Sequence, residues 1–449
     1  MKNFKKFLQE IKQYPSAIFG AIVILALFAA AITIIITIPY NTAIEQWRGG
    51  EDVWYKNPRN APPTWVNWFR KDKLVESFSY SEEDVDHVTR SIEDRPDGTT
   101  RITTLTYTFD FNYDTYPQDM ALYFTSQYSE KQPFVSMKWL TPDGREIRVA
   151  DTAIGTEQTY RFTQDEKLKK RLDGQVANIG LFATPETDPP TPVKGQYQLV
   201  IEAVTFEKDS DVQAEFVVFG QVFSWAGTDH LRRDLALPLQ WGIPIALAFG
   251  LIASLGTALL TMTIAAIGTW YGGFIDSLIQ RITEVNMVLP FLSILIMIGT
   301  FYSRSIWVIL GATVALSIFT GSIKSYRAMF TQVKESTYIE AARSYGAGDA
   351  RIIFKYLIPR MIPLLIPGLV SSVPSFVFLE ASLAVLGLGD PVLPTWGKTI
   401  NEAWANGALY KGYYYWILEP AVLLMITGLG FAMLGFALDR IFNPRLRGV

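Results

Sequence analysis

Long apolar runs alternate along the chain with polar stretches of very different length. Residues 17–38 carry no charge over a length that exceeds the ~20 residues needed to cross a bilayer. Similar runs recur at about 238–267, 287–302, 305–323, 361–389 and 416–438. The first run is too long for the apolar core of a secretory signal, so we expect an uncleaved anchor. The pattern predicts an integral membrane protein with six transmembrane helices.

Basic residues are unevenly distributed among the polar stretches. They precede the first apolar run, follow the last one and crowd the segment 324–360. The short stretches near 303 and 390–415 carry only Arg304, Lys398 and Lys411. By the positive-inside rule, we expect both termini and segment 324–360 in the cytoplasm and residues of about 40–235 outside it.

The long segment between the first two runs is polar but patterned. β-Branched and aromatic residues alternate with polar ones between turn-forming stretches, which predicts half-buried antiparallel strands. Such stretches lie at 99–113, 133–140, 145–150, 196–206 and 212–223. We therefore expect an all-β, sandwich-like extracytoplasmic domain. The Trp- and Pro-rich part at 41–75 is predicted to rest on the membrane surface, although its aromatic residues would alternatively contact substrate.

Composition argues against several kinds of chemistry. The 449 residues have a formal net charge of −3, which argues against a nucleic-acid partner. The chain has no cysteine, so disulfides, a thiol nucleophile and a thiolate metal site are excluded. The two histidines, His87 and His230, are far apart and are interpreted as ordinary residues. The acidic cluster 82–86 is interpreted as a solvated face without catalytic function.

One motif resembles the end of a phosphate-binding loop. Trp396–Thr399 reads WGKT, but Val392 stands where such a loop needs its first glycine. The motif also falls on the predicted non-cytoplasmic side, where ATP is scarce. We expect no nucleotide site in this chain, so any ATP that the protein uses must be bound by a partner.

Segment 338–360 is unusually polar for a stretch between apolar runs, and its pattern predicts two short helices. Thr337 and Glu340 have the spacing of a capping box, and Gly346 is placed to end the first helix in a left-handed conformation. Asp349 is placed to cap a second helix, which Pro359 is expected to end. The second helix would have one apolar face, formed by Ile352, Ile353, Tyr356 and Leu357.

Two interpretations of this segment remain open from the residues alone. The adjacent alanines Ala341 and Ala342 would allow close approach of a partner groove. Alternatively, the segment folds back onto its own membrane helices.

The order of these residues resembles a known family. Glu340-Ala341-Ala342, followed by Gly346 and Pro359, is similar to the EAA loop of permease subunits of binding-protein-dependent ABC importers. Further segments resemble C-type subunits of the dipeptide and oligopeptide permease subfamily, namely 227–234 (GTDHLRRD), 268–290, 380–403 and 443–447 (NPRLR). The resemblance covers about 225–449 and the first apolar run, and it says little about the β-domain. The chain departs from the usual pattern at Arg232, Glu284, Tyr356 and Ile358, where Gly, Asp, Ile and Leu are usual.

The resemblance implies a transport subunit of the cell inner membrane rather than an enzyme. With a second permease, as a heterodimer, it would form the path for peptides delivered by an extracytoplasmic solute-binding protein. Two cytoplasmic ATPase subunits would bind ATP and magnesium. The chain would comprise an N-terminus with the first helix (1–39), the β-domain (40–235), and a permease core (236–449) that carries the EAA loop (324–360). The β-domain is expected to dock the binding protein or the second permease.

Three groups of candidate site residues follow from the motifs. The helix 337–345 would be the coupling helix, so the joint with an ATPase is expected at Glu340, Ala341, Ala342, Arg343, Gly346, Asp349 and Pro359. Structural roles are expected for Gly227, Thr228, Asp229, Arg233 and Asp234, and for Asp276, Arg281 and Glu284 in the turn between the second and third runs. Glu380 is acidic within an apolar run and would line the path or bond to the second permease, unless it lies in reach of water.

Other functions compete with this one. The same machinery would import a non-peptide solute such as an oligosaccharide or a nickel complex. A membrane-anchored sensor with a β-domain would also explain the long segment between the first two runs. A secondary transporter is disfavoured because, apart from Glu380 and Glu419, the apolar runs lack the charges expected for ion coupling.

Overall fold

The computed structural model describes residues 14–96, 99–185, 187 and 189–442. The basic N-terminal residues and the segment 443–447 lie outside the described residues. The chain forms two compact units, a helical unit made of the residues before Gly49 and after Ala236, and a β-unit that spans Gly49–Ala236. The boundary falls in helix α3, Tyr40–Val53, where Gly50 interrupts the helical backbone with a φ of 52°.

Four helical stretches among the described residues are long and apolar enough to cross a membrane. They are α2 (Pro15–Thr37), α6 (Ala236–Tyr271), the continuous stretch Asp349–Leu388 and α16 (Tyr415–Phe442). Two bent pairs would add one span each: α7 (Gly273–Val288) with α8 (Phe291–Phe301), bent by 78°, and α9 (Ile306–Ile318) with α10 (Gly321–Lys334), bent by 50°. The described helices therefore allow four to six spans.

Shorter helices connect these stretches. They are α11 (Thr337–Ser344), α12 (Asp349–Ile352), α14 (Trp396–Ala405) and α15 (Ala408–Lys411). Helix α13 (Ile358–Leu383) follows α12 through a π-helical turn at Ile353–Leu357, and a second π-helical turn, Ala384–Leu388, ends it.

The long helices approach closely at small residues. A Cβ added to Gly20 of α2 would lie 2.6 Å from the Gly430 carbonyl oxygen of α16. A Cβ on Gly250 of α6 would lie 2.6 Å from the Val377 side chain of α13. Such contacts let apolar helices pack by van der Waals interactions where lipid offers no hydrophobic driving force.

The β-unit contains two antiparallel sheets with one core between them. One sheet has the strand order β1-β9-β4-β7, and the other has the order β2-β3-β8-β5-β6. The strands are β1 (Phe78–Tyr80), β2 (Val88–Asp94), β3 (Arg101–Phe111), β4 (Asp119–Gln127), β5 (Phe134–Leu140), β6 (Glu146–Ala153), β7 (Glu157–Arg161), β8 (Gly195–Thr205) and β9 (Asp211–Phe219). Side chains from both sheets join one buried cluster, so the unit is a β-sandwich, as the sequence pattern predicts.

The sequence pattern found five of these strands, β3, β5, β6, β8 and β9, and missed four. Strands β1, β2 and β7 lie at the edges of their sheets, and β1 and β7 are short. Strand β4 is central, and its consecutive residues Met120, Ala121 and Leu122 are all buried, so it lacks the alternation of a half-buried strand.

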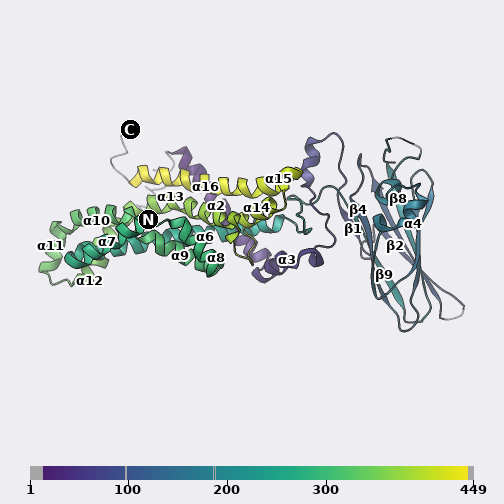
Figure 1. The fold of residues 1–449 in the computed structure, drawn as a ribbon, viewed down its shortest axis with the longest axis horizontal. Coiled ribbons are helices and arrows are strands. Elements are labelled where there is room, and N and C mark those ends of the chain that lie inside the picture. Colours follow the sequence, from purple (N-terminus) through teal and green to yellow (C-terminus); the bar gives the residue numbers. More distant parts are fainter. Residues whose placement is uncertain (1–13, 97–98, 186, 188, 443–449) are drawn as a thin grey trace. The chain divides into compact units, whose positions relative to one another are not determined.

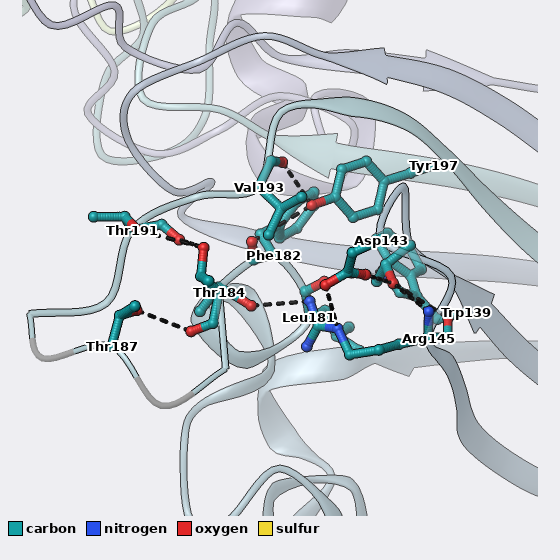
Figure 2. A network of polar contacts seen from close by, with 12 residues as sticks. Trp139, Asp143, Arg145, Leu181, Phe182, Thr184, Thr187, Thr191, Val193 and Tyr197 are labelled. Atoms are coloured by element: carbon teal, nitrogen blue, oxygen red, sulfur yellow. Dashed lines mark hydrogen bonds and ion pairs between the residues drawn. The ribbon is translucent and has the colours of Figure 1, made fainter.

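The long connection between β7 and β8 is held to the sandwich by polar contacts (Figure 2). The indole of Trp139 in β5 donates to the Leu181 carbonyl at 3.1 Å, and the Arg145 guanidinium donates to the Ala183 carbonyl at 3.0 Å. The Tyr197 hydroxyl of β8 donates to the Val193 carbonyl at 2.7 Å. These bonds satisfy backbone carbonyls of a segment that has little secondary structure.

The acidic cluster 82–86 is exposed at Glu83, Asp84 and Asp86, as expected of a solvated face, but not at Glu82. Glu82 is largely buried and pairs with Arg90, which also bonds to Asp211 at 2.5 Å. His87 stacks on the Tyr80 ring at 4.2 Å between centroids. Arg90 of β2 thus connects Glu82 with Asp211 of β9.

Candidate functional site

The residues of the EAA-like segment lie at one end of the helical unit. Figure 1 shows α7, α10, α11 and α12 together at this end, whereas α14 and α15 lie at the opposite end. The EAA-like segment thus lies beside the ends of the long helices.

Helix α11 begins differently from the predicted capping box. Its N-cap is Ser336, which has an extended backbone, and Thr337 is the first helical residue. No side chain caps the helix, because the Ser336 hydroxyl donates back to the Val333 carbonyl of α10 instead. The predicted capping role of Glu340 is therefore wrong. In the described part of the chain its carboxylate has no hydrogen-bond or ion-pair partner, and it is exposed.

The faces of α11 separate the two adjacent alanines. Ile339 and Ala342 are buried beneath the helix, with 1% and 8% exposure. Glu340, Ala341 and Arg343 are exposed on the other side. The expectation that both alanines face a partner is therefore wrong for Ala342, since neighbouring residues on a helix point in different directions.

The end of α11 confirms the predicted left-handed turn. Gly346 has a φ of 77°, and its N–H donates to the Arg343 carbonyl at 2.8 Å. The Ala347 N–H donates to the Ala342 carbonyl at 3.0 Å. Together these bonds form a Schellman motif, which satisfies carbonyls that the helix end would otherwise leave unpaired.

The second helix departs from prediction at both ends. Gly348 is the N-cap of α12, and Asp349 is its first helical residue without a capping bond. Pro359 does not end the helix, because the π-helical turn at 353–357 carries it on into α13. A wider turn leaves room for the proline ring, which would clash with the carbonyl four residues before it in a regular helix. The altered phase leaves Tyr356 37% exposed rather than on the buried face.

An apolar cluster beneath α11 connects it to the long helices. Ile339 of α11 packs with Trp270 at the end of α6 and with Phe330 of α10. The same cluster contains Ile352 and Leu357, and it extends along both long helices through Met262, Ala265, Ala266, Met361 and Leu365. A displacement of α11 would therefore press directly on the ends of α6 and α13, because packed interiors have low compressibility.

Two cations add a polar clamp around Trp270. The Arg343 guanidinium lies 4.7 Å from the centre of the Trp270 ring. The Lys334 ammonium donates to the Thr269 and Trp270 carbonyls, at 2.9 and 3.0 Å, at the C-terminal end of α6. Cations are favoured at this end of a helix and over an aromatic face. Sequence reasoning gave Trp270 and Lys334 no role, although an aromatic residue just before Gly272 and Gly273 was a usable signal.

In the turn between α6 and α7, Asp276 pairs with Arg327 of α10, a residue to which sequence reasoning gave no role in this turn. Asp276 of α7 accepts two bonds from Nε of Arg327 in α10, at 2.7 and 2.9 Å, and one from its Nη2 at 2.5 Å. Arg281 and Glu284 form a separate exposed pair at 3.3 Å. Asp276 does not join that pair, since five residues along a helix place two side chains on different faces.

The segment 227–234 belongs to the β-unit, and its side chains bond to the backbone of the segment itself and of the connector. The buried Asp229 carboxylate accepts bonds from the Leu231 and Arg233 amides, at 2.8 and 2.9 Å, and from Arg233 Nε at 2.6 Å. The Thr228 hydroxyl donates to the Pro58 carbonyl at 2.8 Å. These bonds fix the segment against the connector at 57–61.

Residues at the two ends of this segment are also constrained. Gly227 has a φ of 74°, so the backbone there favours glycine. Asp234 accepts a bond from the Ala236 amide at 2.8 Å, and burial raises the pKa of its carboxyl. Arg232 has a φ of 64°, in the left-handed region that favours glycine. The Arg232 guanidinium lies over the Phe219 ring, 4.7 Å from its centre.

Glu380 is buried in α13, at the end of the helical unit that carries α14. The side chain of Glu380 lies near Thr395, the N-cap of α14, and its exposure is 7%. The WGKT stretch forms the first turn of α14, where the Trp396 indole donates to the Leu239 carbonyl at 2.9 Å. Glu380 thus lies where α13 meets α14, and Trp396 connects α14 to α6.

Comparison with known proteins gives a consistent result. Residues 258–448 match the family described as "binding-protein-dependent transport system inner membrane component". The dipeptide transport system permease protein of Bacillus subtilis is 30% identical over 226 residues, which cover 50% of this chain and 69% of that protein. The oligopeptide transport system permease protein of the same organism is 29% identical over 228 residues, or 50% and 72% of the two chains. The glutathione transport system permease protein of Pectobacterium atrosepticum is 29% identical over 231 residues, or 50% and 73%.

Proposed function

Because this chain belongs to the family of binding-protein-dependent transport system inner membrane components, we propose that it is the permease subunit through which an ATP-driven importer takes up peptides. Permeases of this kind are transport components rather than enzymes. The peptide cargo is proposed from the names of the similar dipeptide, oligopeptide and glutathione permeases. A non-peptide solute remains the alternative.

The proposed topology has six spans. Each bent pair, α7 with α8 and α9 with α10, counts as one span, which together with the four long helical stretches makes six. The excess of basic residues then argues for both termini and α11 in the cytoplasm. The β-unit would lie outside the cytoplasm, where a solute-binding protein arrives.

The packing of α11 is the observation that carries the coupling mechanism. One face of α11 is buried on the ends of α6 and α13, whereas Glu340, Ala341 and Arg343 are exposed on the other. We propose that the exposed face seats in a groove of a cytoplasmic ATPase subunit. ATP and magnesium would be bound by two such subunits rather than by this chain.

ATP would then shift the equilibrium between two orientations of the membrane helices. Closure of the ATPase subunits favours one orientation of the membrane helices by its differential binding energy. The apolar cluster and the clamp around Trp270 would transmit that energy as a rigid-body movement. A second permease would supply the other half of the path, and the β-unit would dock the solute-binding protein or that permease.

A cysteine cross-link tests this assignment directly, because the chain has no native cysteine. Ala341→Cys in the complete complex should cross-link to single cysteines placed along the groove of the ATPase subunit. Purification through this chain should also recover two ATPase subunits and a second permease. Recovery of this chain without them, or a cross-link to no ATPase position, would overturn the proposal and favour the sensor.

The role of the β-unit has its own test. Deleting 80–220 should lower uptake and remove stimulation of ATP hydrolysis by the binding protein, while the ATPase subunits still assemble. If that stimulation is unchanged after the deletion, the β-unit does not dock the binding protein.

A further inference from the structure

A hydroxyl-lined cavity lies among the apolar helices of the helical unit. It has a volume of about 310 Å³ and is bounded by α6, the bend between α9 and α10, and α13. Many of its lining residues bear hydroxyl groups, among them Ser254, Thr257, Thr261, Ser317, Thr320 and Ser372. None of its lining residues is charged.

In the part of the chain that the structure describes, several of these hydroxyls are already paired, whereas the buried hydroxyl of Thr257 is not. Ser254 Oγ donates to the Leu369 carbonyl at 2.7 Å and lies 2.5 Å from Ser372 Oγ. Thr261 donates to the Ile318 carbonyl at 3.1 Å. The Thr257 hydroxyl is buried and has no hydrogen-bond partner within the described residues.

Comparison along α6 makes the Thr257 hydroxyl exceptional. Thr263 and Thr269 on the same helix donate to the carbonyls four residues before them, each at 2.8 Å. A buried hydroxyl without a partner in the protein indicates that another molecule, such as water or a solute, completes its hydrogen bonding.

A second cavity adjoins the first. It has a volume of about 490 Å³ and shares Ser317, Thr320 and Phe376 with the first cavity. It also contains Asn286, whose amide donates to the Leu316 and Phe319 carbonyls at 2.8 Å each. These carbonyls lie where α9 bends into α10. Irregular backbone at membrane depth is tolerated where it lines a cavity, so the bend itself favours a hydrated space.

We propose that the two adjoining cavities are the part of the solute path that this chain supplies, and that their neutral hydroxyls bind the uncharged polar groups of the solute. This inference rests on the proposed function. A hydroxyl both donates and accepts, so it suits the N–H and C=O groups of a peptide backbone. Binding by neutral groups is weak enough for the solute to leave again, as transport requires. Phe376, where the cavities meet, would be an apolar constriction between them. Glu380 lines neither cavity.

Thiol labelling tests whether the space is hydrated. Because the chain has no cysteine, Thr257→Cys and Ser317→Cys are single labelling sites in the intact complex. The probe is the membrane-impermeant 2-sulfonatoethyl methanethiosulfonate. Leu260→Cys is the control, since Leu260 is exposed on the same helix but does not line the cavity. The cavity positions should react on the order of tenfold faster than the control, because the reactive thiolate needs water. Labelling them should also block uptake.

A matched pair of isosteric changes tests the hydroxyl itself. Thr257→Val removes the unpaired hydroxyl, and Thr263→Val removes one that is bonded to its own helix. Uptake of alanyl-alanine should fall about 2- to 10-fold in Thr257→Val, as expected for one hydrogen bond, and should be unchanged in Thr263→Val. The ATPase subunits should assemble normally in both.

The outcomes separate this inference from the proposed function. A wild-type complex that imports no solute with ATP overturns both. A complex that transports, but whose cavity cysteines react no faster than Leu260→Cys, overturns only the cavity assignment. Rapid labelling with unchanged uptake by Thr257→Val refutes the role of the hydroxyl.

Discussion

Gly346 offers a test of the turn after α11 in which backbone conformation is the only variable. Its φ of 77° lies in the left-handed region, and a Cβ added there would meet no atom within 4 Å. A side chain at this position therefore costs only the local backbone penalty of about 1–2 kcal/mol for an L-residue. That penalty corresponds to a roughly 5- to 30-fold loss in the population of the formed turn.

The chain supplies a control two residues away. Gly348 is also exposed, and an added Cβ there would also meet no atom within 4 Å, but its φ is −70°. Gly348→Ala should therefore be tolerated, whereas Gly346→Ala should lower transport. Gly346→Asn should be milder, since asparagine adopts the left-handed region more readily, and Gly346→Val should be the most harmful.

The assay is ATP-dependent uptake by vesicles that contain the complete complex, with ATP hydrolysis measured in parallel. We expect uptake to decrease in the order wild type, Asn, Ala, Val at position 346, at constant amounts of inserted protein. Equal uptake by wild type and Gly346→Val would refute the reasoning. Equal losses in Gly346→Ala and Gly348→Ala would show that side-chain volume, rather than backbone conformation, limits the turn.

Three further changes probe the helix and its supports. Glu340→Lys should abolish transport and ATPase binding. It should change the free energy of unfolding by no more than about 0.5 kcal/mol, because the side chain is exposed and unpaired. The control is Glu335→Lys, the same charge reversal at an exposed residue before α11, which should leave transport normal. Arg343→Gln removes a cation–π contact of about 0.5–1 kcal/mol and should lower the uptake per ATP hydrolysed, whereas Arg351→Gln on α12 should not. Arg233→Met leaves the Asp229 carboxylate buried without its partner, so it should destabilise the β-unit by about 3–5 kcal/mol, measured by limited proteolysis of the complete complex.

Local rules predicted the turn after α11 better than the ends of the two short helices. The left-handed Gly346 follows from one residue type at one position, so the sequence was sufficient. The capping box failed because Ser336 was available one residue earlier and bonded to α10. Pro359 failed as a helix end because a π-helical turn accommodated its ring. These failures have one cause, since neighbouring elements offered each residue a partner or a backbone geometry that sequence spacing cannot reveal.

The sequence by itself determined the membrane class, the β-sandwich and the glycine turn after α11, because hydropathy, periodicity and residue type are properties of neighbouring residues. Only the tertiary structure decided which side of α11 is free. Burial of Ile339 and Ala342 depends on α6 and α13, which lie far away in the sequence. The clamp at Trp270, the pairing of Asp276 with Arg327 and the hydroxyl-lined cavities arise in the same way. Each of these features brings together side chains from different helices, and the spacing of those helices along the sequence does not reveal that they are in contact.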